Sequence, residues 1–370
     1  MVVATVRRFV KERYLPRAGE LFAKEQFAND LIPEIGAMGL LGASLTGYGC
    51  AGMSPAMYGL ALAELEYGDS GLRSFASVQG SLAMFPIWKF GSEAQKQKFL
   101  PGMAKGELIG CFGLTEPDAG SDPGAMTTRA KKDGKDWILN GTKMWITSSP
   151  VANLAVVWAK TGDGDAKSIR GFIVERGMKG FETPTIHGKM SLRASPTGEI
   201  VLSDVRVPEE NMLPEVEGLK GPLSCLTQAR FGIAFGALGA ARACFDSVLS
   251  YSRERSVFGK PIATKQLIQA KLAWMAEEIA KGQIMALHYA RIKEKGDLLP
   301  AHVSLCKKNN VGVSLKIARE ARSILGANGI LLEYPVVRHM LNLESVYTYE
   351  GTDEVHTLVL GQALTGYNAF

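Results

Sequence analysis

The amino-acid sequence predicts an α+β protein of several domains, with helices at both ends and β-strands in the middle. Residues 1–110 carry apolar side chains at helical spacing, whereas residues 111–215 alternate apolar and polar side chains as strands do. Residues 216–370 return to helical spacing in long stretches joined by short links. We therefore expect an all-helical N-terminal domain, a middle antiparallel β domain and a C-terminal four-helix bundle.

The N-terminal region contains clear signals for helix starts. Ser54 stands where an N-cap is expected, with Pro55 at the first helical position, and Ser92 caps a later helix. A single helix is predicted over residues 72–91. The stretch GYGCAG, Gly47–Gly52, matches the G-x-G-x-x-G motif, but that motif needs a preceding strand to bind a dinucleotide. Because it separates two predicted helices, we interpret it as a glycine-rich loop.

The middle region has the turn and strand signals of a β domain. The dipeptides DG at residues 133–134 and NG at 140–141 strongly favour tight hairpin turns. Short β-branched runs over residues 154–160, 171–177 and 199–207 are bounded by turn residues. These runs predict further strands of the same sheet.

The C-terminal region shows helical periodicity in three long stretches, residues 226–256, 264–295 and 301–325. A fourth helix is expected after Glu350. Since the links are short, the helices should pack as neighbours in a bundle. The chain contains neither an internal repeat nor a low-complexity segment.

Composition and charge exclude several classes of function. Apolar residues make up 46% of the chain and charged residues 21%, as in ordinary folded proteins. The net charge of +5 is modest, and the basic residues are not gathered with aromatic residues, so nucleic acid is not an expected partner. A mildly basic surface does suit an anionic small molecule. No apolar run approaches the roughly 18 residues of a membrane span.

The cysteines and histidines indicate a reducing compartment and no metal site. The five cysteines are scattered and include no C-x-x-C, which favours free thiols. The histidines form no H-E-x-x-H motif and no zinc-like pairing with cysteine. The N-terminus is rich in arginine, but Glu12, Glu20 and Glu25 are untypical of a transit peptide, so we interpret it as a surface helix. We expect a bacterial cytoplasmic protein, or a mitochondrial matrix protein if the source is eukaryotic.

Two segments of the β region have the residues to bind a flat polar ligand. Thr115 and Ser121 lie among glycines after a predicted strand, where small side chains let backbone N–H groups approach a ligand. A solvent-exposed turn is the alternative for this loop. Trp145 and Thr147 share one face of a predicted strand, which places an indole beside a hydroxyl. A core tryptophan is the alternative there.

Six motifs together resemble the acyl-CoA dehydrogenase family, and within it the glutaryl-CoA dehydrogenases most closely. They are CFGLTEPDAGSD (111–122), LNGTKMWIT (139–147), IHGKMSLRASPTGEI (186–200), YSRERSVFGKPIATKQLIQ (251–269), ILGANGI (324–330) and YEGT (349–352). They occur in the family's order and cover nearly the whole chain. The resemblance implies the fold predicted above, a homotetramer, FAD bound between the β domain and the bundle, and an electron-transfer flavoprotein as electron acceptor.

The resemblance also implies which residues contact FAD and the acyl-CoA substrate. Cofactor contacts are implied for Phe112, Leu114, Thr115, Gly120, Ser121, Trp145, Ile146, Thr147, Arg255, Phe258, Gln266, Ser323, Leu325, Gly326, Ala327 and Thr352. Arg255 and Gln266 match residues that hold the FAD pyrophosphate from a neighbouring subunit, although a surface charge is the alternative for Arg255. Ala327 stands where a second glycine is common in the family. Substrate contacts are implied for Arg73, Ser74, Ser121, Leu223, Arg230, Gly351 and Phe370.

Glu350 matches the family's catalytic base. Removing the α-proton of an acyl thioester requires a carboxylate of raised pKa, and burial raises a carboxyl pKa by disfavouring the charged form. The resemblance implies that the backbone N–H of Glu350 and a ribityl hydroxyl of FAD stabilise the developing enolate. It also implies that a hydride passes to the flavin. A carboxylate that only favours a helix start is the alternative explanation of Glu350.

Arg73 and Ser74 match the pair that binds the distal carboxylate of a glutaryl substrate, and Glu66 and Tyr349 match the polar network beside it. Arginine suits this role because its guanidinium offers a carboxylate two parallel hydrogen bonds. The alternative is an Asp69–Arg73 pair at i, i+4 on one helix. The glycine and serine between these two residues favour a helix break instead.

The resemblance implies FAD-dependent α,β-dehydrogenation of glutaryl-CoA with decarboxylation to crotonyl-CoA and CO2, as in lysine and tryptophan degradation. A short-chain or branched acyl-CoA dehydrogenase without decarboxylation is the second possibility. An oxidase that passes electrons to oxygen and a non-catalytic helical scaffold are further alternatives.

Overall fold

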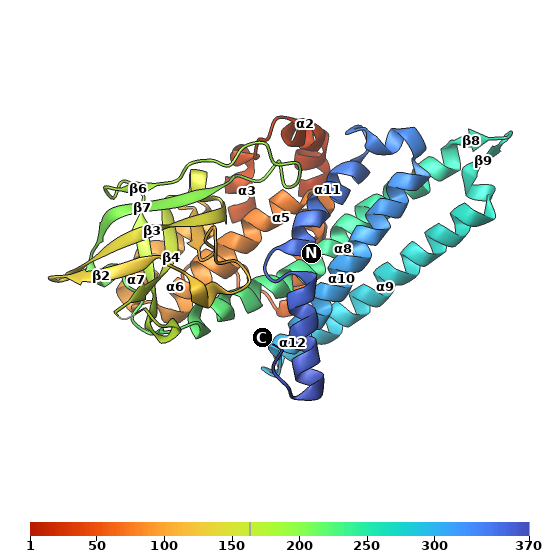
Figure 1. Ribbon diagram of the computed structural model, residues 1–370. Helices are drawn as coiled ribbons and strands as arrows, with labels where there is room; N and C mark the ends of the chain where they lie inside the picture. The colour runs from red at the N-terminus through yellow and green to blue at the C-terminus, as the bar shows by residue number, and fades with distance from the viewer. Residues whose placement is uncertain (163, 370) are drawn as a thin grey trace.

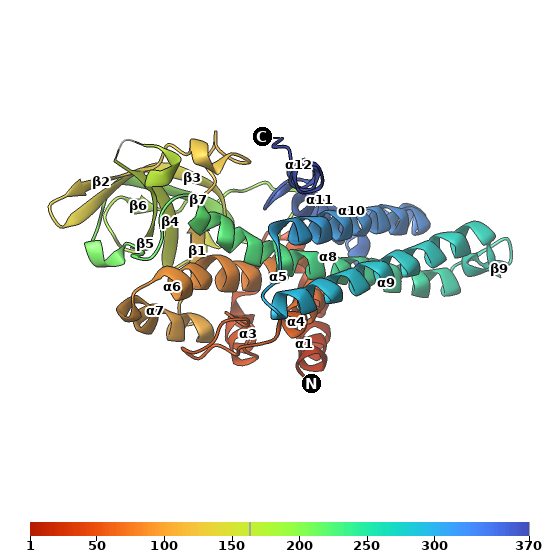
Figure 2. The ribbon, with the colours of Figure 1, turned by 90° about the horizontal axis from the view of Figure 1, so that it is seen from below.

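The structure has the predicted succession of a helical, a β and a second helical region (Figure 1). The computed structural model describes residues 1–162 and 164–369. The β-sheet lies at one end of the molecule, and the long C-terminal helices extend from its neighbourhood to a small hairpin at the opposite end (Figures 1 and 2).

The helices of the first region begin where their capping residues predict. They are α1 (Val2–Phe9), α2 (Ala18–Ala23), α3 (Ile32–Ala37), α4 (Pro55–Gly68), α5 (Ser70–Ser77), α6 (Phe85–Phe90) and α7 (Glu93–Lys105). The Ser54 side chain accepts a hydrogen bond from a backbone N–H of α4, and Ser92 forms a capping box with Gln95 at the start of α7. The loop interpretation of Gly47–Gly52 is confirmed, since this segment lies between α3 and α4 and three of its glycines have positive φ.

The single helix predicted over residues 72–91 is interrupted. A π-helical segment, Val78–Met84, separates α5 from α6. Gly80 lies in this segment, and a Cβ there would stand 3.0 Å from the backbone nitrogen of Gly42. The irregular turn is therefore located where two backbone segments pack directly against each other.

The sheet of the β region is mixed rather than wholly antiparallel. Its strands are β1 (Gly110–Gly113), β2 (Arg129–Asp133), β3 (Asp136–Thr147), β4 (Leu154–Thr161), β5 (Ile169–Glu175), β6 (Phe181–Glu182) and β7 (Thr197–Val207). The order is β1-β4-β2-β3-β7-β6, with β5 also paired to β4. Strands β1 and β2 each pair with β4 in parallel, because long connections rather than tight turns join them to it.

One of the two predicted hairpins is present. The DG dipeptide at residues 133–134 turns the chain between β2 and β3, as predicted. The hairpin predicted at NG is wrong, because Asn140 and Gly141 lie inside β3, at an irregularity in its pairing with β7. Asn140 exchanges hydrogen bonds of 2.9 Å with Asp204, and a Cβ on Gly141 would stand 2.4 Å from the Thr128 side chain. This glycine is needed for close packing, not for a turn.

The C-terminal region has five helices among the described residues, where four were predicted. They are α8 (Lys220–Glu254), α9 (Gln266–Glu294), α10 (Pro300–Ile324), α11 (Pro335–Thr348) and α12 (Asp353–Thr365), with a hairpin of β8 (Ser256–Val257) and β9 (Lys260–Pro261) between α8 and α9. The missed helix is α11. It buries Val336, Leu343 and Val346 at helical spacing together with Arg338, His339 and Asn342, so polar and apolar side chains share its buried face.

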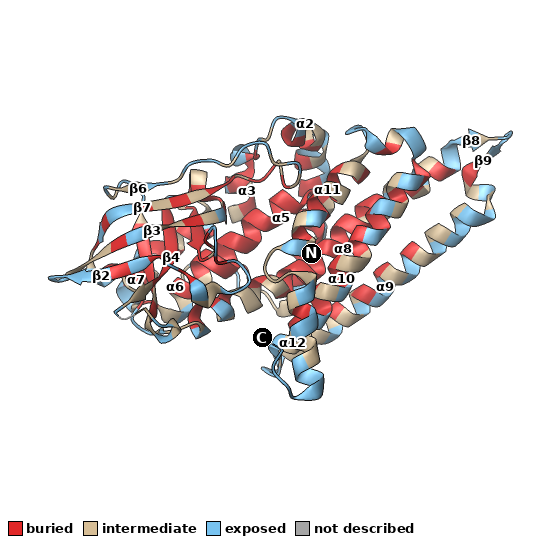
Figure 3. Ribbon diagram, viewed as in Figure 1, coloured by how far each residue is buried: buried red, intermediate tan, exposed pale blue. Residues whose placement is uncertain are grey.

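Shared cores bind the three regions together (Figure 3). One buried cluster contains Ile87 of α6, Met103 of α7, Trp158 of β4 and Cys225 of α8. Among the described residues, α8 is the one helix long and apolar enough to cross a membrane, but 72% of its apolar window is buried inside the protein. Its apolar composition is thus explained by its place in the protein core.

A buried ion pair joins the first region to the bundle. Asp69 separates α4 from α5, and its carboxylate forms an ion pair with Arg338 of α11 at 2.5 Å. Arg338 also donates to the Gly68 carbonyl at 2.7 Å, while Asn342 donates to the same carboxylate at 3.1 Å and accepts from the backbone N–H of Leu192. The alternative Asp69–Arg73 pair is thus wrong. Asp69 instead connects α4 and α5 to α11, and Asn342 extends the connection to a loop of the β region.

Replacing Arg338 with methionine should destabilise the protein strongly. The substitution leaves Asp69 buried without its cation, a change that typically costs about 3–5 kcal/mol. We expect a clearly lower urea midpoint of unfolding. The control is Arg206→Met, which removes ion pairs of a half-exposed arginine with Asp133 and Asp136 at the protein surface. Equal midpoints for Arg338→Met and Arg206→Met would contradict this role of the buried pair.

Candidate active site

Glu350 lies in the short link between α11 and α12. Its backbone is in the left-handed region, with φ of 52°, and Gly351 follows with φ of 89°. Thr352 is the N-cap of α12, and the acidic residues of the first helical turn are Asp353 and Glu354. Glu350 therefore stands outside the helix, and the explanation of this residue as a helix-start carboxylate is wrong.

Two cationic side chains hold the backbone of this link. Arg230 of α8 donates from Nε to the carbonyl oxygen of Glu350 at 2.7 Å. Lys307 of α10 donates from Nζ to the carbonyl oxygens of Tyr349 and Gly351, both at 2.6 Å. Sequence analysis did not identify Lys307. Its position in a long helix is ordinary, and only the fold reveals that it meets the link.

One oxygen of the Glu350 carboxyl group is buried and unpaired, which are conditions that raise a carboxyl pKa. Its Oε2 atom is buried and has no hydrogen-bond partner among the described residues. Burial raises the pKa of Glu350, and the charges of Arg230, Arg73 and Lys307 offset only part of this rise. Burial also lowers the pKa of Lys307 to about 7. An unpaired carboxylate oxygen of raised pKa has the properties that a general base requires.

The Arg73 guanidinium lies in a buried polar cluster close to this carboxyl group. Its Nε donates to Oε2 of Glu66 at 2.6 Å, and its Nη2 donates to the Tyr349 hydroxyl. Ser74 lies 3.5 Å from the same hydroxyl. Arg73 is 1% exposed and Glu66 0%. The structure thus brings together the four residues that sequence analysis grouped around a substrate carboxylate.

The electrostatics of this cluster favour a permanent positive charge. Burial opposes the charge of Arg73, but Glu66 and Tyr349 raise the pKa of Arg73 above its ordinary value. Burial raises the pKa of Tyr349 to about 12, so its hydroxyl stays protonated. Oε1 of Glu66 has no partner among the described residues. A free acceptor beside a fixed guanidinium leaves unused hydrogen-bonding capacity in a buried place.

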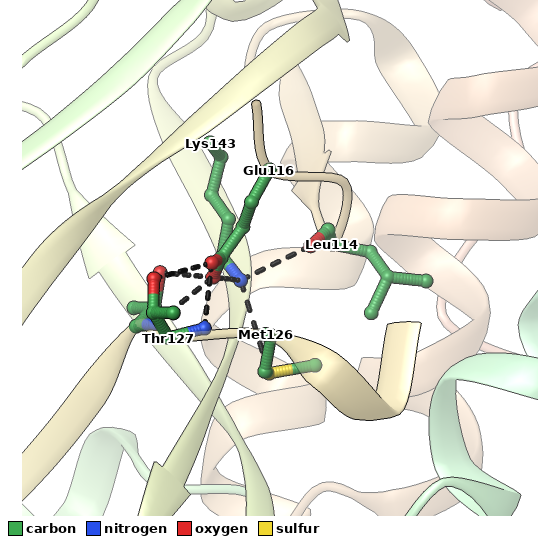
Figure 4. Close-up of polar contacts among 6 residues, drawn as sticks. Leu114, Glu116, Met126, Thr127 and Lys143 are labelled. Carbon is green, nitrogen blue, oxygen red and sulfur yellow. Dashed lines mark hydrogen bonds and ion pairs between the residues drawn. The ribbon is translucent and has the colours of Figure 1, made fainter. Parts of the chain in front are cut away.

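The loop that contains Thr115 and Ser121 is held by a buried ion pair. Glu116 accepts hydrogen bonds from both Thr127 and Thr128, and Nζ of Lys143 lies 2.8 Å from its carboxylate (Figure 4). Lys143 also donates to the Leu114 carbonyl at 3.1 Å. Burial opposes the charge of Glu116, but Lys143 and these hydrogen bonds lower its pKa to about 2. Sequence analysis missed both charged residues, although each lies inside a motif that it quoted.

The cofactor candidates of the β region surround this loop. Thr115 accepts a hydrogen bond at its carbonyl from the backbone N–H of Met144 in β3, which places the loop beside that strand. Trp145 has a positive φ of 62° and is 56% exposed, so it is not a core tryptophan. Phe112, Leu114 and Ile146 are buried, Thr147 is half-buried, and Gly120 and Ser121 are exposed. An exposed indole in a strained backbone beside hydroxyl groups suits a flat aromatic ligand.

The remaining cofactor candidates are not brought together with these residues. Arg255, Phe258 and Gln266 lie at the β8–β9 hairpin, at the opposite end of the molecule from the sheet (Figure 1). Phe258 is 93% exposed and has a positive φ of 55°. Leu325 is buried at the end of α10, while Ser323, Gly326 and Ala327 are exposed.

The structure also places most of the substrate candidates. Leu223 lies near the start of α8 and is 39% exposed. Gly351 packs closely, since a Cβ there would stand 2.8 Å from Nε2 of His356. Phe370 lies outside the described residues.

Family comparison accounts for the three regions. Models of the acyl-CoA dehydrogenase N-terminal, middle and C-terminal domains match residues 1–107, 111–205 and 217–365. The chain belongs to the acyl-CoA dehydrogenase family. Members of this family are FAD-dependent, and FAD is the cofactor of this acyl-CoA dehydrogenase. The predicted helical, β and helical architecture is confirmed in the same way.

Individual relatives differ in the substrate that their names give. A crystal structure of a glutaryl-CoA dehydrogenase from Mycobacterium smegmatis in complex with FADH2 is 54% identical to this chain, with a TM-score of 0.97. The match covers 100% of this chain and 95% of the M. smegmatis chain. A short-chain specific acyl-CoA dehydrogenase of Megasphaera elsdenii is 37% identical over 96% of this chain and 95% of its own length. A structure described as the electron transferring flavoprotein of Acidaminococcus fermentans contains a chain that is 34% identical, with a TM-score of 0.95 over 99% of this chain and 97% of its own.

The residues present fit FAD. Exposed aromatic side chains at positive φ, Trp145 and Phe258, occur in both groups of cofactor candidates. Arg255 and Gln266 beside Phe258 are exposed and carry donors suited to a pyrophosphate. The β8–β9 hairpin that carries this second group lies at the far end of the molecule from the sheet that carries the first (Figure 1).

Replacing Glu116 with glutamine should loosen the Thr115 loop and alter the acid stability of the protein. The carboxylate pKa falls from 4.5 to about 2 on folding, so its stabilising effect is complete above about pH 4.5 and is lost as the pH falls toward 2. The variant leaves Lys143 buried without its anion. We expect its unfolding temperature to lie below that of the wild type at neutral pH, with the difference narrowing between pH 4.5 and pH 2. A difference in unfolding temperature that does not change with pH would contradict the stabilising role of the Glu116 carboxylate.

Proposed function

We propose that this acyl-CoA dehydrogenase oxidises glutaryl-CoA and decarboxylates the product to crotonyl-CoA and CO2. The observation that carries the proposal is the buried cluster of Arg73, Glu66, Ser74 and Tyr349 next to Glu350. A guanidinium in this position suits a substrate that ends in a carboxylate. For a plain aliphatic chain, a buried cation at the end of the acyl pocket would be unfavourable.

The identity values support the same assignment. The chain shares 54% of its residues with the M. smegmatis glutaryl-CoA dehydrogenase but 37% with the M. elsdenii short-chain enzyme. A short-chain acyl-CoA dehydrogenase that releases no CO2 is the second candidate, favoured by the names of the curated relatives. The two candidates differ in what Arg73 contacts at the far end of the substrate.

In the proposed reaction, Glu350 removes the α-proton of the thioester. Its free Oε2 can accept that proton, and its raised pKa brings its basicity closer to what the weakly acidic α-carbon requires. Arg230 holds the left-handed backbone of Glu350 by a hydrogen bond to its carbonyl oxygen. The direction of the carboxyl group is therefore set by the backbone, while Oε2 of that group has no hydrogen-bond partner among the described residues. Bound FAD supplies the acceptor for the two electrons that leave with the β-hydrogen. Loss of the distal carboxylate as CO2 then leaves a dienolate carbanion, which protonated Glu350 can reprotonate.

Arg73 holds the distal carboxylate of the substrate until that group leaves. Two of its nitrogen atoms are engaged by Glu66 and Tyr349, which fix the plane of the guanidinium. Nη1 makes no hydrogen bond to the described residues and is the donor that we assign to the substrate carboxylate. Burial makes this contact strong and also favours departure of the group as neutral CO2 rather than its retention as a charged carboxylate.

We further propose a homotetramer in which Arg255, Phe258 and Gln266 of one subunit complete the FAD site of another. The distance of the β8–β9 hairpin from the sheet, whose strand β3 contains Trp145, supports this arrangement (Figure 1). An electron-transfer flavoprotein is the proposed acceptor, supported by the likeness to a chain in the A. fermentans flavoprotein structure. The five free cysteines suit the reducing cytoplasm or mitochondrial matrix.

Glu350→Gln should keep FAD and lose reduction by glutaryl-CoA. Glutamine preserves the shape of the side chain but cannot accept the α-proton, and loss of a general base typically lowers a rate by about 10²–10⁴-fold. Flavin bleaching after anaerobic mixing measures the loss. Glu354→Gln, which changes an exposed glutamate in the first turn of α12, is the matched control and should bleach normally. Rapid bleaching of Glu350→Gln would rule out this residue as the base.

Arg73→Met should impair glutaryl-CoA turnover far more than butyryl-CoA turnover. Losing one partner of a buried charged contact typically costs about 2–5 kcal/mol, so we expect the ratio of the two kcat/KM values to fall about 10²-fold. Arg73→Lys keeps the charge without the planar pair of donors, so its ratio of kcat/KM values should lie between those of the wild type and of Arg73→Met. Product analysis for CO2 accompanies each assay. Equal losses on both substrates would favour the short-chain candidate.

A further inference from the structure

We propose that Lys307 is a positioning residue that fixes the backbone and sets the basicity of Glu350. The inference rests on the proposed function, because it concerns the residue proposed as base. It holds equally for glutaryl-CoA and for plain acyl-CoA substrates. Lys307 lies on α10, 1% exposed, between the link that carries Glu350 and the rest of the bundle.

The hydrogen bonds of Lys307 bracket Glu350. Its Nζ donates to the carbonyl oxygens of the residues immediately before and after Glu350, each at 2.6 Å. Arg230 donates to the carbonyl between them. Three consecutive carbonyls therefore accept hydrogen bonds from Lys307 and Arg230, and this arrangement fits the positive φ values of Glu350 and Gly351. A non-glycine residue holds such a backbone only when its surroundings enforce it.

An amine has a property here that a guanidinium lacks. A lysine that has lost its proton keeps two N–H donors, which is the number of bonds that Lys307 makes to the link. Both hydrogen bonds to the link can therefore persist while the charge of Lys307 beside Glu350 changes. The charged groups that act on this pair are Arg73 of α5, Arg230 of α8 and Asp353 of α12. Two neutral groups also face it: His356 of α12, whose pKa burial lowers to about 3, and the Tyr349 ring, whose centroid lies 5.9 Å from Nζ.

The direction of the effect follows from the charges. A positive Lys307 stabilises the carboxylate form of Glu350, so removing it leaves Glu350 with a still higher pKa. The fraction of Glu350 present as a base then rises only at higher pH. Loss of the two hydrogen bonds from Lys307 also lets the backbone of the link move. A small displacement of the reacting carboxyl group typically costs about 10²-fold in rate.

The test follows proton transfer alone. The holoenzyme is first reduced chemically, so that no hydride can leave, and exchange of the α-protons of butyryl-CoA into D2O is measured by mass spectrometry across neutral pH. Lys307→Met removes charge and donors at nearly constant length. We expect exchange to slow about 10²-fold and the midpoint of its pH profile to move upward. Lys307→Gln, which is smaller and fits the same space, should move the midpoint in the same direction even if the methionine variant folds poorly.

Lys316→Met is the control on the same helix. Lys316 of α10 is exposed, and its Nζ lies over the Trp274 ring instead of donating to the link carbonyls. Its variant should keep both the rate and the midpoint of the wild type, and FAD absorbance and the unfolding temperature should be recorded for all variants. An unmoved midpoint in the folded Lys307 variants overturns the inference, since a merely structural role lowers the rate without shifting the profile. Absence of exchange in the wild type would instead refute Glu350 as base.

Discussion

The burial of a carboxyl group among three cations is the constraint on which the candidate active site depends. Burial raises the pKa of Glu350, whereas the positive charges of Arg230, Arg73 and Lys307 lower it and would by themselves make its carboxylate a weaker base. The two effects oppose each other, and burial is the larger. The result is a carboxyl group that can both accept and return a proton, as oxidation followed by reprotonation of a carbanion would require.

The cations achieve this balance because their hydrogen bonds go elsewhere. Arg230 and Lys307 donate to backbone carbonyls, and Arg73 donates to Glu66 and Tyr349. No hydrogen bond from the described residues reaches Oε2 of the Glu350 carboxylate, so this atom stays unpaired. A direct ion pair would lower the pKa of the carboxyl group and occupy the oxygen that must take the proton. The protein thus places positive charge near the proposed base without bonding to it.

The sequence predicts those parts of this arrangement that follow local rules. Ser54 and Ser92 cap helices because capping depends on neighbours three residues apart. The NG at residues 140–141 was wrongly predicted to form a hairpin turn, because its glycine is required by close packing against Thr128. That contact exists only in the folded protein, so the local sequence does not reveal it. Helix α11 was missed because it buries charged and amide side chains that contact other regions. Motif resemblance led to Glu350 and Arg73, but Lys307, Glu116 and Lys143 act through contacts that no local pattern displays.

Tyr349 and Glu350 are neighbours in the chain, and this adjacency connects the two ends of the proposed substrate. The Tyr349 hydroxyl contacts Arg73, while its carbonyl oxygen accepts from Lys307. A carboxylate bound at Arg73 must therefore share that guanidinium with Tyr349, and any shift of the ring is transmitted to the backbone that aims Glu350. Lys307 resists such a shift by holding the carbonyls on both sides of Glu350. In the proposed reaction, recognition of the distal carboxylate and proton transfer at the α-carbon would therefore depend on the same short link, whose carbonyls are held by cations of two separate helices, Arg230 of α8 and Lys307 of α10.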